Sequence, residues 1–398
     1  MKAYDIAVIG AGASGLAAAI EAKRTNAELS VAVFEHLPRV GKKILATGNG
    51  RCNLGNLNAD THAYTNRSFA QYALTEYNAE SLIDFFESMG LFTRADSEGR
   101  LYPLSNTAAS VLDALRFECE KLGVQFFCDY QVSSVKKASS IFNINGEYFA
   151  ERIIIACGGK SSPAQGSDGS GYPLLKNLGH NITPLAPALV QLVTDTEKIK
   201  ALKGVRASAR LTLSTGGEAK GEILFTDYGL SGIAAMDLSR FISPDKKAFI
   251  TIDLLPDFDV KKAKSAVFAA VKRNPDQSAE YLLGGLVPKA LGTAVIKSAL
   301  GFLPKTAKEI TEESAKKIAL ELKGFTLTLK GSKSFNDAQI TKGGADVRQF
   351  DSRTMMSKKT DGLYACGEIL DVDGACGGFN LSWAFASGRL AGKNAATA

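Results

Sequence analysis

The segment that decides the fold is Ile6–Glu35, IAVIGAGASGLAAAIEAKRTNAELSVAVFE. Its first residues, Ile6–Ile9, form a short apolar run that suits a buried parallel strand. A G-x-G-x-x-G loop and a helical segment follow, and a second strand, Leu29–Phe34, ends at Glu35. This order of strand, glycine loop, helix, strand and acid predicts a Rossmann unit that binds a dinucleotide.

Each position of this motif has a physical role. Gly10 permits a tight turn, Gly12 lets the backbone approach a pyrophosphate, and Gly15 lets the helix pack on the strand. The free N–H groups at the helix start face the phosphates, and the acid accepts hydrogen bonds from a ribose. The alternative is a glycine-rich turn without a ligand. The nucleotide contacts that we expect here are Gly10, Gly12, Ala13, Ser14, Gly15, Glu35 and His36.

The next segment, GKKILATGNGRCNLGN at residues 41–56, favours a ligand longer than NAD. An NAD-binding fold would continue here with another helix and strand. A glycine-rich loop with cationic side chains instead offers a second surface for phosphates and a ring system. An ordinary surface loop is the alternative. The predicted contacts are Lys42, Lys43, Thr47, Gly48, Gly50, Arg51, Cys52 and Asn53.

Two further segments are typical of FAD enzymes of the glutathione-reductase type. The β runs 124–128, 131–136 and 141–144, with a turn at Asn145-Gly146, precede a strand at 152–156 that ends in Cys157-Gly158-Gly159. Near the end, the strand 362–366 leads to Gly367-Glu368 and to a helix opened by Asn380, whose N–H groups would face the flavin. A plain C-terminal helix is the alternative. The expected cofactor contacts are Val132, Ala156, Cys157, Gly158, Gly367, Glu368, Asp373, Gly378, Phe379, Asn380 and Leu381.

Composition excludes several other classes of protein. The 398 residues carry a net charge of +6 with scattered Lys and Arg, which argues against a nucleic-acid partner. The six cysteines form no C-x-x-C and the three histidines stand alone, so we expect reduced thiols and no metal site. No apolar window is long enough for a membrane helix. We expect a cytoplasmic protein with a small-molecule substrate, and the sequence indicates no oligomeric state.

Four stretches carry a resemblance to a known family: GAGASGL, TGNGRCNLGN, ACGGKSSPAQGSDGSGY and TMMSKKTDGLYACGEILDVDGACGGFNLSWAFASGRLAG. The chain resembles the BaiN/YhiN-like NAD(P)/FAD-dependent oxidoreductases, also described as aminoacetone-oxidase-family FAD-binding enzymes. The resemblance implies an α/β fold whose FAD-binding Rossmann domain, of the glutathione-reductase type, is made from both chain ends. It also implies an inserted domain with a small β-barrel-like part and a helical part. The expected boundaries are 1–185 and 343–398 for the FAD domain, 186–258 and 324–342 for the β-rich insert, and 259–323 for the helical part.

The resemblance also implies a reaction. Hydride would pass from NAD(P)H, a transient co-substrate, to FAD and on to an enone- or carbonyl-type substrate. An amine oxidase that uses oxygen is one alternative. An RNA-associated or regulatory flavoprotein is another, with a basic stripe at Lys261, Lys262, Lys264, Lys272 and Arg273. Cys52 lacks the second cysteine that a disulfide reductase needs.

The chain departs from the family pattern at one loop. Where the family has FTH-x-G-x-SGP, this chain has FTDYGLSGI at residues 225–233, so that Asp227 replaces the histidine and Ile233 the proline. If this loop meets the flavin, the substrate or the protonation step differs from that of relatives. The candidate catalytic residues are Arg51, Cys52, Asp227 and Tyr228.

Overall fold

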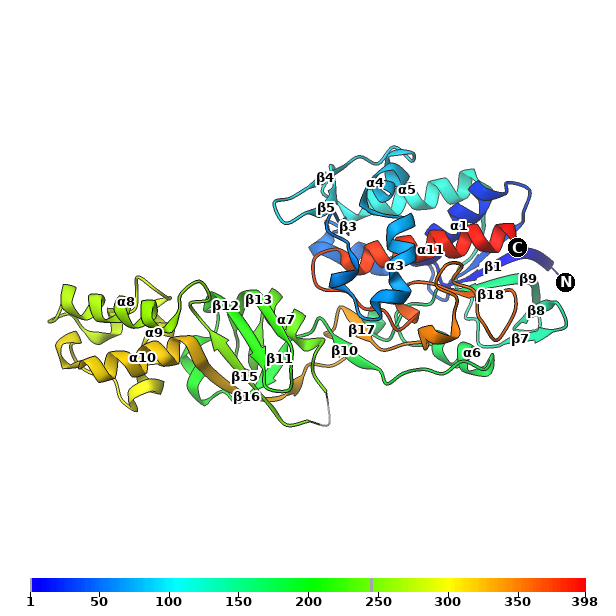
Figure 1. Ribbon diagram of the computed structural model, residues 1–398. Coiled ribbons are helices and arrows are strands. Elements are labelled where there is room, and N and C mark those ends of the chain that lie inside the picture. Colours follow the sequence, from blue (N-terminus) through cyan, green and yellow to red (C-terminus); the bar gives the residue numbers. More distant parts are fainter. Residues whose placement is uncertain (1, 244–245) are drawn as a thin grey trace. The chain divides into compact units, whose positions relative to one another are not determined.

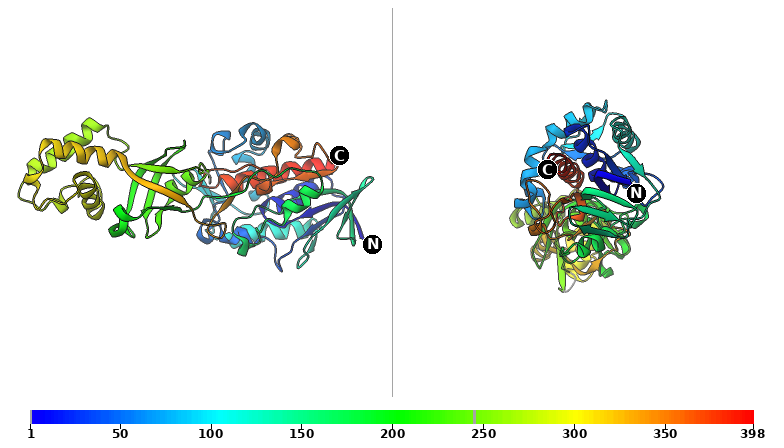
Figure 2. Two further views of the ribbon diagram at one scale, coloured as in Figure 1. Left: turned by 90° about the horizontal axis from the view of Figure 1, so that it is seen from below. Right: turned by 90° about the vertical axis from the view of Figure 1, so that its right-hand side faces the viewer.

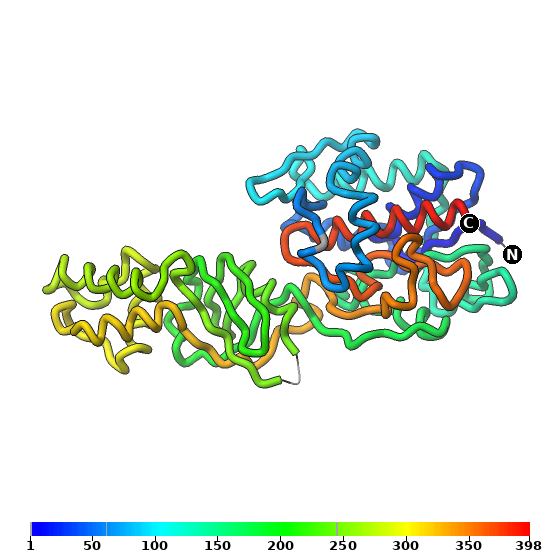
Figure 3. Tube along the Cα trace, viewed as in Figure 1, coloured from blue at the N-terminus to red at the C-terminus, as the bar shows by residue number. Residues whose placement is uncertain are grey.

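The computed structural model describes residues 2–243 and 246–398. The described residues form two compact units (Figures 1 and 3). Unit 1 combines the two ends of the chain, Met1–Ala186 and Gln339–Ala398, and unit 2 is the inserted segment Pro187–Ala338. The short strands β10 (Ala186–Ala188) and β17 (Ile340–Lys342) lie where the chain leaves and re-enters unit 1.

The sheet of unit 1 is built around two central parallel strands. β1 (Lys2–Ile9) pairs in parallel with β9 (Tyr148–Ile155) and, on its other side, with β2 (Val31–Phe34). The first half of β9 pairs with β8, and its second half pairs in parallel with β18 (Leu363–Ala365). The sheet is completed by β6 (Gln125–Phe127), β7 (Val135–Ala138) and β8 (Ile141–Ile144), in the order β6-β2-β1-β9-β8-β7. The C-terminal strand therefore lies beside the strand that follows the meander.

Helices α1 (Ala13–Thr25) and α11 (Phe379–Thr397) pack against each other, although they come from opposite ends of the chain (Figures 1 and 2). Glycines allow their backbones to touch. A Cβ atom at Gly388 would lie 2.3 Å from the carbonyl oxygen of Ser14, and one at Gly392 would lie 2.1 Å from that of Ala18. The single tryptophan, Trp383, is buried on α11.

A small antiparallel sheet and several helices surround this core in unit 1. The sheet has the order β3-β5-β4, with β3 (Gly55–Asn56), β4 (Thr93–Ala95) and β5 (Arg100–Pro103). The helices are α2 (Lys42–Ala46), α3 (Arg67–Glu76), α4 (Ala79–Glu87), α5 (Ala108–Lys121) and α6 (Gly171–Asn177). Short 3-10 turns are η1 (Thr47–Gly50), η2 (Thr61–Ala63), η3 (Pro163–Gln165), η7 (Val347–Gln349) and η8 (Gly367–Ile369).

Unit 2 consists of a closed antiparallel barrel and a helical part. The barrel has the order β11-β14-β13-β12-β15-β16, and β11 pairs with β16 to close it. Its strands are β11 (Leu192–Thr194), β12 (Arg206–Leu213), β13 (Glu218–Phe225), β14 (Gly229–Ser231), β15 (Ala248–Asp253) and β16 (Phe325–Ser332). The helices are α7 (Ile233–Ser239), α8 (Val260–Arg273), α9 (Lys289–Leu300) and α10 (Glu312–Gly324), with 3-10 turns η4 (Glu197–Leu202), η5 (Ala279–Tyr281) and η6 (Ala307–Glu309).

The predicted fold class is confirmed: a Rossmann domain made from both chain ends, with an inserted barrel and helices. One predicted strand, 131–136, is wrong in its first half, since β7 starts only at Val135. The Asn145 side chain accepts hydrogen bonds from the backbone N–H groups of Ser133 and Ser134 and donates one to the carbonyl of Gln131. These backbone groups are therefore not available to a strand ladder.

The contact between α1 and α11 predicts a position-specific effect of alanine on stability. Gly392→Ala places a methyl group against the Ala18 carbonyl, so we expect a loss of roughly 1–3 kcal/mol in the free energy of unfolding. Urea unfolding followed by Trp383 fluorescence measures it. The matched control is Gly324→Ala on α10, whose Cβ would meet nothing within 4 Å and should leave this transition unchanged. Equal behaviour of the two variants would contradict the prediction.

Candidate cofactor-binding site

The glycine loop after β1 has the geometry that a pyrophosphate site requires. Gly10 has φ +102°, and a Cβ atom there would lie 2.6 Å from the Ala156 carbonyl oxygen. At Gly15 a Cβ would lie 1.9 Å from the Gly10 carbonyl, so only glycine fits. At Gly12, the N-cap of α1, a Cβ would meet nothing within 4 Å. The open side of the loop is therefore where a ligand can approach the backbone.

Glu35 lies directly beside this loop, as the motif predicts. Its Oε2 accepts a hydrogen bond from the Ala11 N–H at 2.9 Å, and its Oε1 accepts one from the Leu37 N–H at 3.0 Å. His36 Nδ1 lies 3.2 Å from the same Oε1. The carboxylate is buried, and these contacts hold it at the position where a ribose hydroxyl would bind.

An ion pair joins the second predicted loop to the C-terminal part of the chain. Lys43 Nζ lies 2.7 Å from Glu368 Oε2 and donates a hydrogen bond to the Ser161 carbonyl. The Glu368 Oε1 accepts the Thr341 N–H at 2.9 Å. Lys42, the neighbouring lysine, is exposed.

Thr341 is a residue of this site that the sequence analysis missed. Its hydroxyl oxygen accepts hydrogen bonds from the N–H groups of Lys160, at 2.7 Å, and Ser161, at 3.0 Å. The same hydroxyl donates to Ser161 Oγ. Thr341 is buried and ties the glycine-rich turn after β9 to Glu368. The residues next to Thr341 in the sequence give no signal for this role, because its hydrogen-bond partners lie far away along the chain.

The loop from Thr47 to Asn53 is tightly coiled. Gly48, Asn49, Gly50 and Cys52 all have positive φ angles. Cys52 is fully buried, and burial raises its pKa to about 11, so the thiol stays protonated at neutral pH and is no reactive thiolate. The side-chain oxygen of Asn53 is buried without a hydrogen-bond partner among the described residues. Such an orphaned acceptor fits a ligand that donates to it.

The C-terminal motif brings the start of α11 to the same region. Gly367, with φ +76°, donates its N–H to Ser387 Oγ, and its carbonyl accepts the indole N–H of Trp383. α11 begins at Phe379, next to the expected Asn380, and Gly378 is its N-cap, without a side-chain cap. The Asn380 side chain instead bonds the backbone of Gly374, which fixes the preceding loop. The first N–H groups of α11 are left for a ligand.

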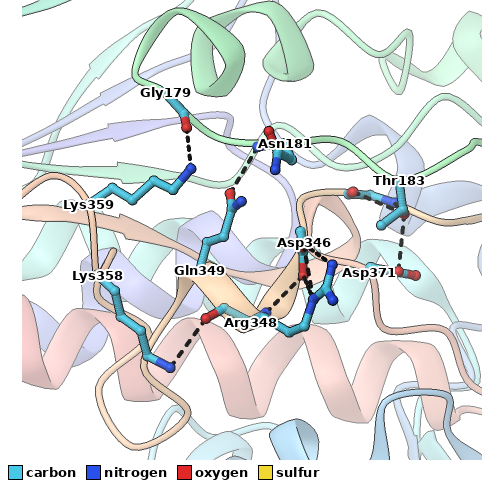
Figure 4. A network of polar contacts seen from close by, with 10 residues as sticks. Gly179, Asn181, Thr183, Asp346, Arg348, Gln349, Lys358, Lys359 and Asp371 are labelled. Carbon is cyan, nitrogen blue, oxygen red and sulfur yellow. Dashed lines mark hydrogen bonds and ion pairs between the residues drawn. The ribbon is translucent and has the colours of Figure 1, made fainter.

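A network of polar contacts holds the segment that leads to this motif (Figure 4). Thr183 Oγ1 donates to Asp371 Oδ2 at 3.1 Å, and burial raises the pKa of Asp371. Asp346 pairs with Arg348 at 2.7 Å, and the side chain of Gln349 accepts the Asn181 N–H. The network shown in Figure 4 also includes Gly179, Lys358 and Lys359. These contacts fix the backbone on both sides of Glu368.

The remaining predicted cofactor contacts follow β9 or β6 or lie near the start of α11. Ala156, Cys157 and Gly158 follow β9 next to the glycine loop, where the Cys157 thiol donates to the Ile9 carbonyl. Asp373, buried near the start of α11, accepts a hydrogen bond from Thr65 Oγ1. Val132 is buried after β6, and Leu381 lies in the first turn of α11. Asp227 and Tyr228 belong to unit 2, whereas Arg51 and Cys52 belong to unit 1.

Asp227 is an exposed acid with a lysine partner. Lys203 Nζ lies 2.7 Å from its Oδ2, and this hydrogen-bonded ion pair lowers the pKa of Asp227. The carboxylate is therefore ionised at neutral pH and is a poor proton donor in this conformation. Tyr228 lies under the Lys333 ammonium group, 4.3 Å from the ring centroid. Neither residue has the burial that usually accompanies a tuned acid or base.

These features fit FAD: an open glycine loop, a carboxylate beside it, an orphaned Asn53 oxygen and an uncapped helix start. The model of the HI0933-like protein Rossmann domain matches residues 4–394. The chain belongs to the HI0933-like family. Among the relatives of this family member is the 3-dehydro-bile acid delta(4,6)-reductase of Clostridium scindens, 37% identical and covering 98% of each chain. Another is the ribosomal RNA dihydrouridine synthase of Escherichia coli, 31% identical over 97% of this chain and 96% of the relative.

Solved flavoenzymes share the fold of this HI0933-like protein. The 3-ketosteroid delta1-dehydrogenase of Sterolibacterium denitrificans has a TM-score of 0.52 at 12% identity, with both chains fully covered. The open form of a flavocytochrome c3 fumarate reductase has a TM-score of 0.51 at 17% identity and covers all of this chain and 78% of its own. These structures share only the fold; the family and its relative named as a reductase identify the chain as an FAD-binding oxidoreductase.

The described part of the chain contains no helix long and apolar enough to cross a bilayer. The same residues include no cluster of three or more His, Cys, Asp or Glu that could hold a metal ion.

The role of Thr341 predicts a loss of FAD affinity on removal of one oxygen atom. Thr341→Val keeps the shape but leaves two backbone N–H groups, the buried one of Ser161 and the part-buried one of Lys160, without their acceptor, at a cost of about 1–3 kcal/mol in stability. We expect weaker FAD binding, measured as free FAD after ultrafiltration, and an earlier urea transition. Thr341→Ser keeps the hydroxyl and should retain FAD. If valine and serine behave alike, the hydroxyl does not organise the site.

Proposed function

We propose that this protein reduces a carbon–carbon double bond conjugated to a carbonyl group in a small organic substrate, with NAD(P)H as the electron donor. The observation that carries the proposal is the full-length match to a relative named for such a reduction. FAD, when bound, supplies the hydride transfer between donor and substrate. The chain's own residues bind the cofactor and set the charge around it.

The relatives' names describe one type of chemistry. A 3-dehydro-bile acid with double bonds at positions 4 and 6 is a conjugated enone, and its reductase saturates such a bond. Dihydrouridine differs from uridine by two hydrogens across a double bond next to a ring carbonyl. Both reactions add hydride to an electron-poor carbon and a proton to its neighbour. A shared reaction type is therefore a better guide to this chain than either substrate alone.

The described residues support this chemistry through charge and shape. The uncapped start of α11 offers N–H groups and the positive end of the helix dipole, which stabilise negative charge on a reduced flavin. The ion pair between Lys43 and Glu368 fixes the acid for contact with a ribityl hydroxyl. The buried Cys52 stays a neutral thiol, so it adds no competing redox step.

The proposal predicts a two-stage anaerobic experiment. NADH or NADPH should bleach the visible flavin band, because a nicotinamide donor passes hydride to the flavin. A steroid 4,6-dien-3-one added next should restore the oxidised spectrum and gain two hydrogens by mass spectrometry. The saturated steroid is the matched control and should restore nothing. Bleaching by an amine without a nicotinamide donor would instead favour the amine oxidase, and bleaching by neither would refute the proposed donor.

A second candidate substrate is a uracil base in RNA. Two relatives are named ribosomal RNA dihydrouridine synthases, at 31% and 29% identity. Residues 259–323 carry twelve Lys or Arg and seven Asp or Glu. This segment therefore has a net charge of +5, and the whole chain has a net charge of +6. On α8, Lys261, Lys262, Lys272 and Arg273 are exposed, and none makes an ion pair with a described carboxylate. An unpaired basic helix face is suited to RNA phosphates.

This candidate predicts salt-dependent RNA binding through α8. Replacing its four exposed cations by glutamine should weaken binding of a ribosomal RNA fragment and flatten the plot of log K against log salt by up to about 3 units. Fluorescence anisotropy measures both. The control replaces four lysines that already pair with carboxylates: Lys264, Lys289, Lys308 and Lys317. It removes the same charge. If both variants weaken binding equally, α8 has no specific role, and if the wild type binds no RNA, this candidate fails.

A further inference from the structure

We propose that Arg51 and Arg94, which both contact the ring of Tyr102, bind the phosphate groups of the nicotinamide dinucleotide that reduces the enzyme. The inference rests on the proposed function, which takes NAD(P)H as the donor. It assigns to that donor a docking site on unit 1 that is separate from the glycine loop for FAD.

The two guanidinium groups share one aromatic ring. The Arg51 Cζ atom lies 5.2 Å from the Tyr102 ring centroid, and the Arg94 Cζ atom lies 5.7 Å from it. The tyrosine is buried, whereas both arginines are exposed. In the proposed complex each guanidinium group binds one of the two phosphates of the pyrophosphate.

Local structure explains why both arginines are held at this ring. Arg94 on β4 is the cross-strand partner of Tyr102 on β5, so their side chains share one face of the sheet. Arg51 follows η1, and its Nε donates to the Gly48 carbonyl at 3.2 Å. A Cβ atom at Gly48 would lie 3.7 Å from the ring of Tyr102. The coiled loop thus packs on the ring and presents its arginine beside it.

The two carboxylates on the same hairpin pair with a third arginine, Arg100, and not with Arg51 or Arg94. On the same hairpin, Arg100 Nε lies 2.7 Å from Asp96, and its Nη1 lies 3.2 Å from Glu98. Among the described residues, neither Arg51 nor Arg94 makes an ion pair, and their polar contacts are to neutral oxygens. Two cations on one ring without a counter-ion repel each other, and an anion removes that repulsion. Guanidinium groups bind phosphates through paired N–H donors.

An exposed apolar pair continues the same face. Phe92 and Leu104 flank the Arg94–Tyr102 pair; the Leu104 N–H bonds the Phe92 carbonyl, and their side chains are 57% and 60% exposed. The surface therefore combines two unpaired cations with a phenyl ring and an isobutyl group. A nicotinamide dinucleotide has the matching pattern, because its pyrophosphate lies between two planar ring systems.

The fold leaves the donor no other dinucleotide motif. The sequence contains one G-x-G-x-x-G, and unit 2, in its described residues, is a barrel with helices rather than a second Rossmann unit. Arg51 belongs to the loop with Cys52 and Asn53 that the sequence predicts beside the flavin. A donor held by this arginine would therefore lie next to the predicted cofactor loop.

The test compares equilibrium binding to the FAD-loaded full-length protein. Inorganic pyrophosphate, NAD+ and NADP+ are titrated by calorimetry into the wild type and into R51Q/R94Q. We expect pyrophosphate and at least one dinucleotide to bind, and the double variant to weaken both by about tenfold or more. Arg67→Gln, at the exposed start of α3, removes the same charge and should change affinity less than twofold. Arg94 lies outside the predicted FAD contacts, so R94Q alone should keep its FAD and still weaken the binding of both ligands.

Several results would overturn the inference. These are unchanged affinity in the double variant, loss of FAD from R94Q, or wild-type binding of pyrophosphate without either dinucleotide. Stopped-flow bleaching separates this inference from the proposed function. If NADH and NADPH both fail to bleach the wild type, the proposed donor is wrong. If the wild type is bleached and R51Q/R94Q shows the same donor concentration dependence, only the arginine site is wrong.

Discussion

The packing of α11 against α1 is the contact on which the rest of unit 1 depends. At Gly388 and Gly392 the helix backbones touch, with no room for a side chain between them. Gly367 is similarly close to Ser14, since a Cβ there would lie 2.5 Å from its hydroxyl oxygen. This close approach places the C-terminal motif over the glycine loop of β1. Without it, Glu368 and the start of α11 would not reach the residues that the N-terminal segment provides.

The ion pair of Lys43 and Glu368 has a geometric role rather than a large energetic one. Both side chains are partly exposed, at 29% and 20%, so the net stabilisation from the charges is modest. Its value is that Glu368 is also bonded by the Thr341 N–H, and Lys43 by the Ser161 carbonyl. Segments from four regions of the chain thus converge on a single carboxylate. A cofactor site keeps its geometry when such supporting contacts hold each of its side chains in one conformation.

The sequence predicts the parts of this structure that depend on local patterns. Gly10, Gly12, Gly15 and Glu35 occupy the places that the Rossmann motif assigns to them, because turn geometry and helix packing act over a few residues. Thr341 escapes prediction since its partners lie far away in sequence.

One strand prediction is wrong, and for one catalytic candidate the structure adds information that the sequence lacks. The run at 131–134 reads as a strand, but the Asn145 side chain binds its backbone. Asp227 reads as an acid–base candidate because it replaces a family histidine. Its ion pair with Lys203 and its exposure are tertiary facts that no spacing reveals. Local periodicity therefore predicts the scaffold well, and side chains that reach across the fold determine the details of the site.

The division of unit 1 into two chain segments has a consequence for biosynthesis. β1, α1 and β9 emerge from the ribosome before the whole of Pro187–Ala338, and α11 emerges after that segment. Unit 2 is continuous in sequence and can fold during translation, as domains generally do. The face of α1 that carries Ser14 and Ala18 lacks its partner until α11 has been made. The nascent chain therefore exposes apolar surface on α1 while unit 2 is synthesised, and the cofactor site is completed only once α11 has emerged.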